Sequence, residues 1–332
     1  MKILSLGVIA LFATLSFAHA EETGPLVLAK TIPLPGVTGG FNHHSADGKN
    51  HRLFLCASTN KTVEVVNLDT GKVEQSLAGD KPAAICFAAD EGLLCVSRGK
   101  TVQIYDARTF KSLASLPMPS SVDELHYDAR THQLLAGCMS SPNVGITPID
   151  LTGPKVLAEI KSPKPQGFAL EDGGHRVFVC TPSTDGVSVL DREKPAVVTA
   201  WKFEGAAGEY PAAYDATTHR LFVGCRRPAK LLVIDTDTGK TVAAVDIGRD
   251  TDDLSFDVTN RRVYVACGEG VTSVVQQDDA DHYRNIATIA TAPGGRNCGF
   301  VPETGEYFVT VPQQPGQEAK VLIYRAPLQK AP

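Results

Sequence analysis

The sequence predicts an all-β fold, a seven-bladed β-propeller with four antiparallel strands in each blade. Three observations predict it. A unit of about 40 residues recurs seven times, apolar and polar residues alternate with a period of two within each unit, and the mature chain sustains no helical period. Four short strands over that length are typical of a propeller blade.

The repeat is clearest in the short apolar run that forms the second strand of each unit. These runs begin 40 to 44 residues apart, at Leu53, Leu93, Leu134, Val177, Leu221, Val263 and Tyr307. In unit five the strands are predicted at residues 212–215, 220–225, 231–235 and 240–247. The turn before the last strand contains Gly239, which supplies the positive φ that a tight hairpin needs.

The two ends of the chain are predicted to close the ring together. The last unit has only three predicted strands, at residues 298–301, 306–312 and 320–325. A lone strand at residues 25–34 precedes unit one. We expect it to pair with the last unit as its fourth strand, because this closure hides edges that an open stack would expose.

Several short motifs carry a family resemblance. The runs LFVGC, VYVACGEG and LFLCAS, followed by VxVxD and DTGK, resemble the YVTN repeat. Residues 25–325 as a whole resemble the exported, bacterial YncE-like seven-bladed propellers. The Gly-His and Trp-Asp pairs of WD40 repeats are absent, so the repeat is WD40-like in architecture only. The resemblance implies the fold, whereas it leaves activity open, because propellers host many functions.

Residues 1–20 are predicted to be a signal peptide. Lys2 is the positive residue, residues 3–17 are almost wholly apolar, and Ala18-His19-Ala20 is a small-x-small cleavage site. We expect residues 21–332 to be one exported propeller domain, periplasmic or secreted and monomeric, without a membrane anchor. An uncleaved anchor is the alternative. The net charge of −5 argues against nucleic-acid binding.

Two sets of charged residues recur from unit to unit at one end of the predicted blades. They are Asp47, Asp128, Asp215 and Asp257, and Arg52, Arg176, Arg220 and Arg262. A feature repeated in several blades is explained by the blade itself. We therefore expect these side chains to cap turns or form local ion pairs.

The segments that enter the first strand of each unit differ between units, and they should surround one mouth of the channel together with the loops between the second and third strands, which contribute Arg226 and Arg227. Polar residues that vary around a ring are what a ligand site needs. The predicted ligand-binding residues are Asn42, His43, Asp123, Glu124, Gln166, Tyr210, Arg226, Arg227, Asp252, Asp253, Arg296 and Asn297.

These residues allow three kinds of chemistry. Glu124 and Asp252 could hold Ca²⁺ or Mg²⁺, the three arginines could clamp a carboxylate or phosphate, or the charges could simply hydrate the channel. His43 and His44 are adjacent, so in a strand they would point to opposite sides. The sequence thus predicts a binding or scaffold protein for a small polar or anionic ligand or a protein partner.

A metal-assisted hydrolase or lyase, similar to a lactonase, is the alternative function. The sequence contains no G-x-S-x-G, H-E-x-x-H or phosphate-binding glycine loop, which argues against the commonest hydrolases and metalloproteases. Whether the protein is an enzyme stays open, with a binding role favoured.

The chain has eight cysteines, and an even number in an exported protein invites disulfides. Five of them, Cys56, Cys138, Cys180, Cys225 and Cys267, recur near the end of the second strand, where small buried apolar residues are expected. Cys86 and Cys95 flank a short hairpin in unit two and could form a disulfide across it.

Overall fold

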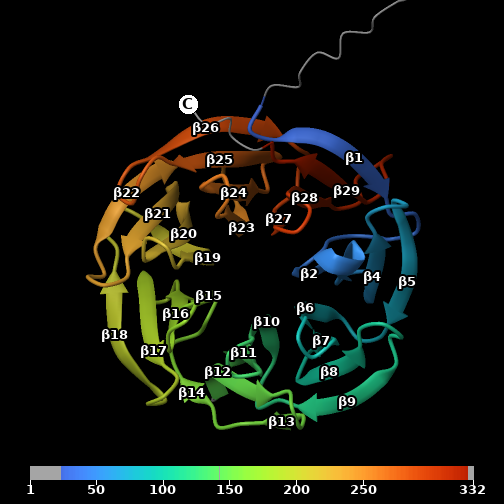
Figure 1. Cartoon of the computed structure of the whole chain (residues 1–332), viewed down its shortest axis with the longest axis horizontal. Helices are drawn as coiled ribbons and strands as arrows, with labels where there is room; N and C mark the ends of the chain where they lie inside the picture. The colour runs from blue at the N-terminus through green and yellow to red at the C-terminus, as the bar shows by residue number, and fades with distance from the viewer. Residues whose placement is uncertain (1–23, 142, 328–332) are drawn as a thin grey trace, which may run out of the picture.

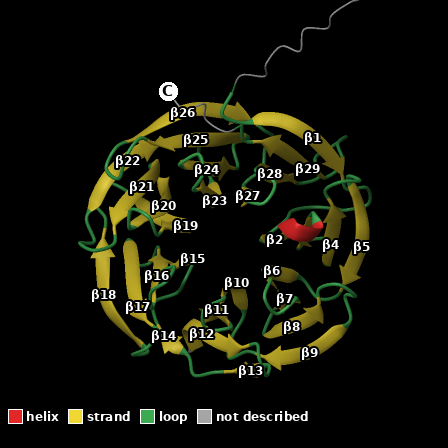
Figure 2. Ribbon diagram, viewed as in Figure 1, coloured by secondary structure: helices red, strands yellow, loops and turns green. Residues whose placement is uncertain are grey.

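The computed structural model describes residues 24–141 and 143–327, and these form a closed ring of seven antiparallel sheets (Figure 1). The protein is a seven-bladed β-propeller, as the sequence predicts. The expected signal peptide at residues 1–20 lies outside the described residues. Strands make up almost all of the regular structure, and a single turn of 3-10 helix, η1 (Gly48–Asn50), is the exception within the described ranges (Figure 2).

The strands are numbered along the chain, and each blade runs from the channel outward. Blade one contains β2 (His44–Asp47), β3 (Arg52–Ala57), β4 (Thr62–Asn67) and β5 (Lys72–Ala78). Blade two contains β6 (Pro82–Ala88), β7 (Leu93–Arg98), β8 (Thr101–Asp106) and β9 (Ser112–Pro117). Blade three contains β10 (Val122–Asp128), β11 (Gln133–Ser140) and β12 (Asn143–Asp150), with an outer strand in two pieces, β13 (Lys155–Val156) and β14 (Ile160–Lys161).

The remaining blades follow the same plan. Blade four contains β15 (Gly167–Leu170), β16 (Arg176–Thr181), β17 (Gly186–Asp191) and β18 (Ala196–Lys202). Blade five contains β19 (Ala207–Asp215), β20 (Arg220–Arg227), β21 (Ala229–Asp235) and β22 (Thr241–Asp246). Blade six contains β23 (Thr251–Asp257), β24 (Arg262–Cys267), β25 (Val271–Gln277) and β26 (Tyr283–Ala290). Blade seven contains β27 (Asn297–Val301), β28 (Glu306–Val311), β29 (Lys320–Arg325) and the N-terminal β1 (Val27–Pro33).

The predicted closure by the first strand is confirmed. β1 lies beside β29 (Figure 1) and pairs with it antiparallel, and the register places Ile32 opposite Val321. Ile32 and Leu34 are fully buried between blades seven and one, where they pack with Leu55. The inner strands contact one another around the channel, and β27 contacts β2 to complete the ring. No sheet among the described residues is left at the end of an open stack.

Burial explains the strand composition. The second strand of each blade lies between two others and between two neighbouring blades, so it is a continuous apolar run, as in β3 and β24. The outermost strands have one solvent-facing side and alternate, as in β22. In six blades the register shifts between the third and fourth strands, and such bulges increase the local twist.

The repeated aspartates cap turns, as predicted. Asp47 accepts a hydrogen bond from the backbone N–H of Asn50 at 3.1 Å, and Asp215 accepts one from Thr217 at 2.9 Å. Asp128 and Asp257 do the same for the backbone two and three residues further along. These hydrogen bonds fix the hairpin between the first two strands, so the aspartates stabilise the blade.

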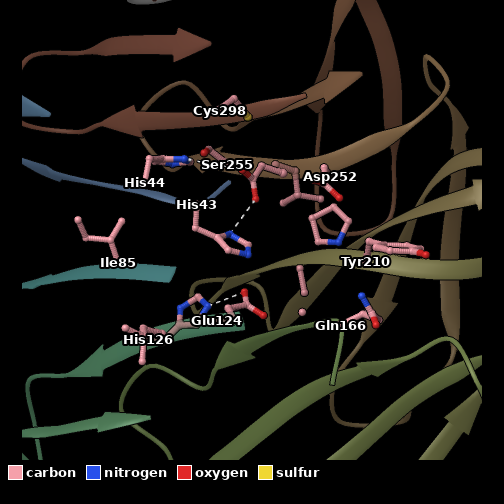
Figure 3. A pocket seen from close by; sticks show the side chains of 16 residues that line it. His43, His44, Ile85, Glu124, His126, Gln166, Tyr210, Asp252, Ser255 and Cys298 are labelled. Atoms are coloured by element: carbon pink, nitrogen blue, oxygen red, sulfur yellow. Dashed lines mark hydrogen bonds and ion pairs between the residues drawn. The ribbon is translucent and has the colours of Figure 1, made fainter. Parts of the chain in front are cut away.

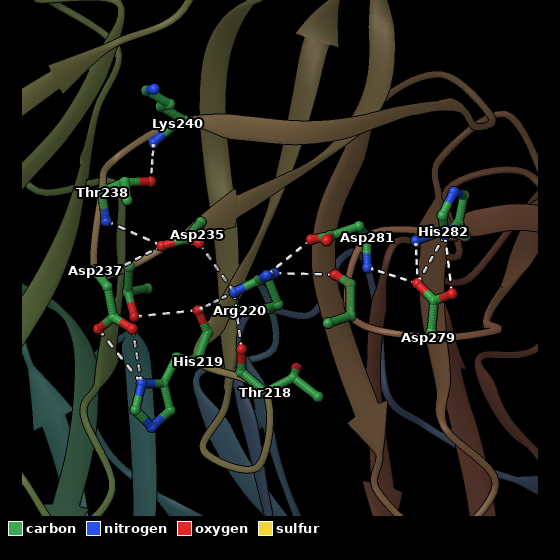
Figure 4. A network of polar contacts seen from close by, with 12 residues as sticks. Thr218, His219, Arg220, Asp235, Asp237, Thr238, Lys240, Asp279, Asp281 and His282 are labelled. Carbon is green, nitrogen blue, oxygen red and sulfur yellow. Dashed lines mark hydrogen bonds and ion pairs between the residues drawn. The ribbon is translucent and has the colours of Figure 1, made fainter.

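The repeated arginines hold neighbouring segments together. Arg220 lies 3.4 Å from Asp235 of its own blade and 2.8 Å from Asp281 of blade six, and it also donates to backbone carbonyls (Figure 4). Arg52 pairs with Asp47 at 2.7 Å. Arg262 instead donates to the carbonyl oxygen of Pro25 at 3.1 Å and so ties blade six to the closing strand.

Candidate functional site

The inner strands enclose a cavity of about 140 Å³ in the central channel (Figure 3). Six of the predicted ligand-binding residues line it, namely His43, Glu124, Gln166, Tyr210, Asp252 and Asp253. Half of the twelve ligand-binding residues predicted from the sequence therefore line this one cavity. Two lining residues that the sequence did not predict, His44 and His126, add imidazole groups to the site.

His43 and His44 both approach the carboxylate of Asp253. The Nδ1 atom of His43 lies 3.6 Å from Oδ1, and that of His44 lies 3.7 Å from Oδ2. The expectation that the two rings point to opposite sides is wrong, because β2 begins only at His44 and His43 precedes the strand. The amide of Asn297 donates to Asp253 at 3.1 Å, so this carboxylate joins three side chains.

The two rings have opposite protonation behaviour. Burial by itself lowers the pKa of His43, but the hydrogen bond and charge of Asp253, with Glu124 and Asp123, raise it to about 10. Burial lowers the pKa of His44 to about 4 against the pull of Asp253, and the neighbouring charge of His43 adds to the lowering. At neutral pH His43 is therefore a cation paired with Asp253, while His44 is neutral.

Asp252 belongs to a separate ion-pair cluster at the mouth of the channel. Its carboxylate lies 2.5 Å from Arg226 Nη2 and 3.3 Å from Arg296 Nε. Both guanidinium groups also approach Asp250, at 3.6 Å and 3.4 Å. Two members of the predicted anion clamp are thus paired with the protein's own carboxylates, and the third, Arg227, does not line the channel cavity.

Tyr210 is held by this cluster. The guanidinium of Arg226 lies 3.8 Å from the centre of its ring, a close cation–π contact. β19 begins at Ala207, five residues earlier than predicted, and its register shifts between Glu209 and Ala212. This bulge carries Tyr210 into the channel, where it stands beside Gln166 (Figure 3).

Glu124 has a different environment from the other carboxylates. One oxygen, Oε1, lies 2.9 Å from Nε2 of His126, two residues along β10 and therefore on the same side of the strand. The other oxygen, Oε2, is buried and has no hydrogen-bond partner in the part of the chain that the structure describes. Glu124 lies among the residues around the cavity (Figure 3), and no arginine or lysine of the described chain lies within 4.0 Å of its carboxylate.

Asn42 and Asp123 lie outside the channel cavity. The amide of Asn42 is 3.4 Å from the carboxylate of Asp123, and both side chains line a neighbouring cavity over blades one to three. Arg296 and Asn297 line another cavity, of about 180 Å³, together with Asp250. The predicted ring is therefore divided among adjacent cavities instead of forming one continuous funnel.

The described residues give the metal hypothesis no complete ligand set. In residues 24–141 and 143–327, no three His, Cys, Asp or Glu side chains group closely enough to hold a metal ion. Glu124 is hydrogen-bonded to His126 and Asp252 is paired with arginines, so the two predicted ligands serve different partners.

The cysteines are free thiols in the structure. Cys86 and Cys95 lie opposite each other across the first hairpin of blade two, as predicted, and both are free thiols in the structure, so the disulfide that this placement allows stays a prediction. Burial raises the pKa of Cys86 to about 12, so its thiolate is scarce at neutral pH. The five recurring cysteines are fully buried among apolar side chains, as expected.

Solved structures with the same architecture confirm the fold. The chain is similar to a structure of hydrazine synthase from Kuenenia stuttgartiensis, with a TM-score of 0.77 and 14% identity over 88% of this chain and 97% of that one. It is similar to a chain of a mitotic checkpoint complex, also with a TM-score of 0.77, with 16% identity over 98% of both chains. At these identities the likeness shows the fold alone.

Searches by sequence add nothing to that likeness. No protein-family model matches the chain, and no curated protein matches it. The similarity to the YVTN repeat and to YncE-like propellers therefore stays a resemblance. Within the described residues, no helix is long and apolar enough to span a membrane.

Proposed function

We propose that this propeller is a binding protein whose channel takes a small polar molecule with a hydrogen-bond donor, a hydroxyl or an amine. The observation that carries the proposal is the buried oxygen Oε2 of Glu124, which has no hydrogen-bond partner among the described residues and belongs to a side chain that lines the cavity. A buried acceptor without a partner costs free energy, and a donor on the ligand would remove that cost.

The charge pattern favours a donor over an anion. Arg226 and Arg296 are paired with Asp250 and Asp252, and His43 is paired with Asp253. Glu124 contacts His126 and lies near the charge of His43, but no arginine or lysine of the described residues pairs with it. An anionic ligand would meet this carboxylate without a free arginine to compensate it, whereas an amine would complete the pairing.

The size of the cavity restricts the ligand. A volume of about 140 Å³ is below the range of about 300–1,000 Å³ in which drug-sized ligands bind. Gln166 offers both a donor and an acceptor, and the phenol of Tyr210 can do the same. We infer a ligand of a few heavy atoms, or one end of a larger molecule, recognised by polar contacts.

Calorimetric titration with small probes tests the proposal. Ethanolamine and glycerol supply the donors and acetate supplies the anion. We expect ethanolamine to bind most tightly and acetate least. Glu124→Gln keeps an oxygen for His126 but loses the charge, and it should weaken ethanolamine binding about tenfold to a hundredfold, because a hydrogen bond to a charged group contributes about 1.5–3 kcal/mol.

The matched control is Glu74→Gln, on the exposed outer strand of blade one, which should bind the probes as the wild type does. Tighter binding of acetate than of ethanolamine would contradict the proposal. So would equal affinities in the wild type and Glu124→Gln. Native mass spectrometry of the purified protein would identify a ligand that remains bound.

We also propose that the protein is exported, that it is a monomer and that it belongs to the YncE-like propellers. Export is supported by the N-terminal pattern of Lys2, an apolar run and Ala18-His19-Ala20. The intact mass of the mature protein should correspond to a chain that begins at Glu21. A mass that retains residues 1–20, or light scattering that gives a dimer, would contradict this proposal.

A further inference from the structure

A second cavity, of about 590 Å³, opens beside the channel over blades one, two and three. Three cations line it, and none of them serves the channel site. Arg98 ends β7, Lys100 follows it in the loop to β8, and Lys81 lies just before β6. We therefore ask what ligand this cavity could accept.

Arg98 is a buried cation that has no counter-ion among the described residues. Arg98 is 8% exposed. Its guanidinium donates hydrogen bonds to the backbone oxygens of Asp80 at 2.7 Å and Leu77 at 3.2 Å. Within the ranges that the structure covers, no carboxylate lies within 4.0 Å of it, and its Nε atom is buried without a hydrogen-bond partner. Buried charges are normally paired, so this one creates a positive potential.

The loop that Arg98 holds also places Lys81. Gly79 packs directly on the guanidinium, since a Cβ atom there would lie 2.8 Å from Nη1. The loop is therefore fixed two residues before Lys81. Lys81 and Lys100 are exposed, and neither forms an ion pair in the described chain. Two lysines and one arginine thus face one cavity with their charges available.

Two carboxylates, Asp80 and Asp123, line the same cavity. Asp123 already has partners in the protein. It accepts a hydrogen bond from Asn42. Burial alone would lower the pKa of His43, and the charge of Asp123 helps to raise it. Three cations against two carboxylates leave the cavity with a surplus of positive charge.

We propose that this cavity binds a small molecule through an oxyanion, a phosphate or a carboxylate group. Lys81 and Lys100 contact the oxyanion, and Arg98 fixes the loop and adds its field. The proposal does not rest on the function proposed for the channel, because the two sites differ in residues and in the sign of their charge. Phosphate and carboxylate share the recognition chemistry, and the two probes below distinguish them.

The test is calorimetric titration of the full mature protein with inorganic phosphate and with citrate, at low ionic strength, where screening is weak. We expect one or both to bind the wild type. The double variant Lys81→Ala/Lys100→Ala should bind about tenfold more weakly, since two partly exposed ion pairs contribute about that factor. Arg98 is not replaced, because its loss would release the loop.

Two control variants make the result specific. Lys111→Ala removes an exposed lysine from the same blade at the opposite face, and Glu124→Gln alters the channel. Both should bind phosphate and citrate as the wild type does. Failure of both probes to bind the wild type overturns the proposal. Equal affinity in the double variant, or an equal loss in Lys111→Ala, also overturns it, because the binding would then be general attraction to surface charge.

Discussion

Replacing Ile32 with alanine tests the closure of the ring by its first strand. Ile32 is fully buried and packs with Leu55 and Val321 between blades one and seven. Truncation of such a side chain costs about 2–5 kcal/mol through lost burial and the cavity that remains. A loss of about 3 kcal/mol is a large share of the roughly 5–15 kcal/mol by which a protein is usually stable. At about 2–4 °C per kcal/mol, the melting temperature should fall by about 10 °C.

The neighbouring residue gives the control. Thr31 is exposed on the same strand, so Thr31→Ala should change the free energy of unfolding by about 0.5 kcal/mol or less. Both variants are measured by urea denaturation and by differential scanning calorimetry against the wild type. Equal stability of Ile32→Ala and Thr31→Ala would refute the closure. Deletion of residues 21–34 should be worse than either substitution and lead to aggregation, because it exposes the edge of β29.

Three further predictions concern polar groups. Arg220→Met should lower the free energy of unfolding by about 2–3 kcal/mol in urea, less than a wholly buried pair would, because one partner is solvent-exposed; unchanged stability would contradict the bridging role. Burial lowers the pKa of His43, but the hydrogen bond and charge of Asp253 outweigh burial and raise that pKa to about 10. The stability that this pair contributes is complete below pH 6.5 and is lost as the pH rises through 10. The difference in free energy of unfolding between the wild type and Asp253→Asn, measured in urea, should therefore shrink from pH 7 to pH 10. A difference that stays constant over this range would refute the pairing. The denatured protein should show eight thiols without reductant, whereas six would reveal the disulfide between Cys86 and Cys95.

The fold could be predicted from the sequence because the repeat imposes the same constraints seven times. The last complete strand, β29 (Lys320–Arg325), matches its predicted bounds, since an apolar run buried on both faces has few alternatives. The start of β19 was missed, because Gly208 adopts a positive φ of 71° and a bulge follows it. Blades two, three and six also shift register between their first two strands, but among the inner strands the positive-φ glycine belongs to β19, so the repeat does not predict the longer strand.

The sequence could predict which positions surround the channel, but not which side chains form ion pairs or hydrogen bonds with one another. Arg226 meets Asp252 across the boundary between blades five and six, and that distance depends on how the blades are packed. His126 was missed although a signal existed, because it lies two residues after Glu124 and so shares its side of the strand. Adjacent His43 and His44 were placed wrongly because the strand begins between them.

The pairing of charged side chains distinguishes residues that stabilise the blades from residues that are available to bind a ligand. Asp215 and Arg220, which belong to the recurring sets, have their partners in their own blade or in the next one. Two incompletely paired charges occur where the blades differ. Glu124 of blade three has a buried oxygen without a partner, and Arg98 of blade two has no carboxylate among the described residues. Because the two lie in adjacent cavities and have opposite signs, substitutions at one should leave ligand binding at the other unchanged.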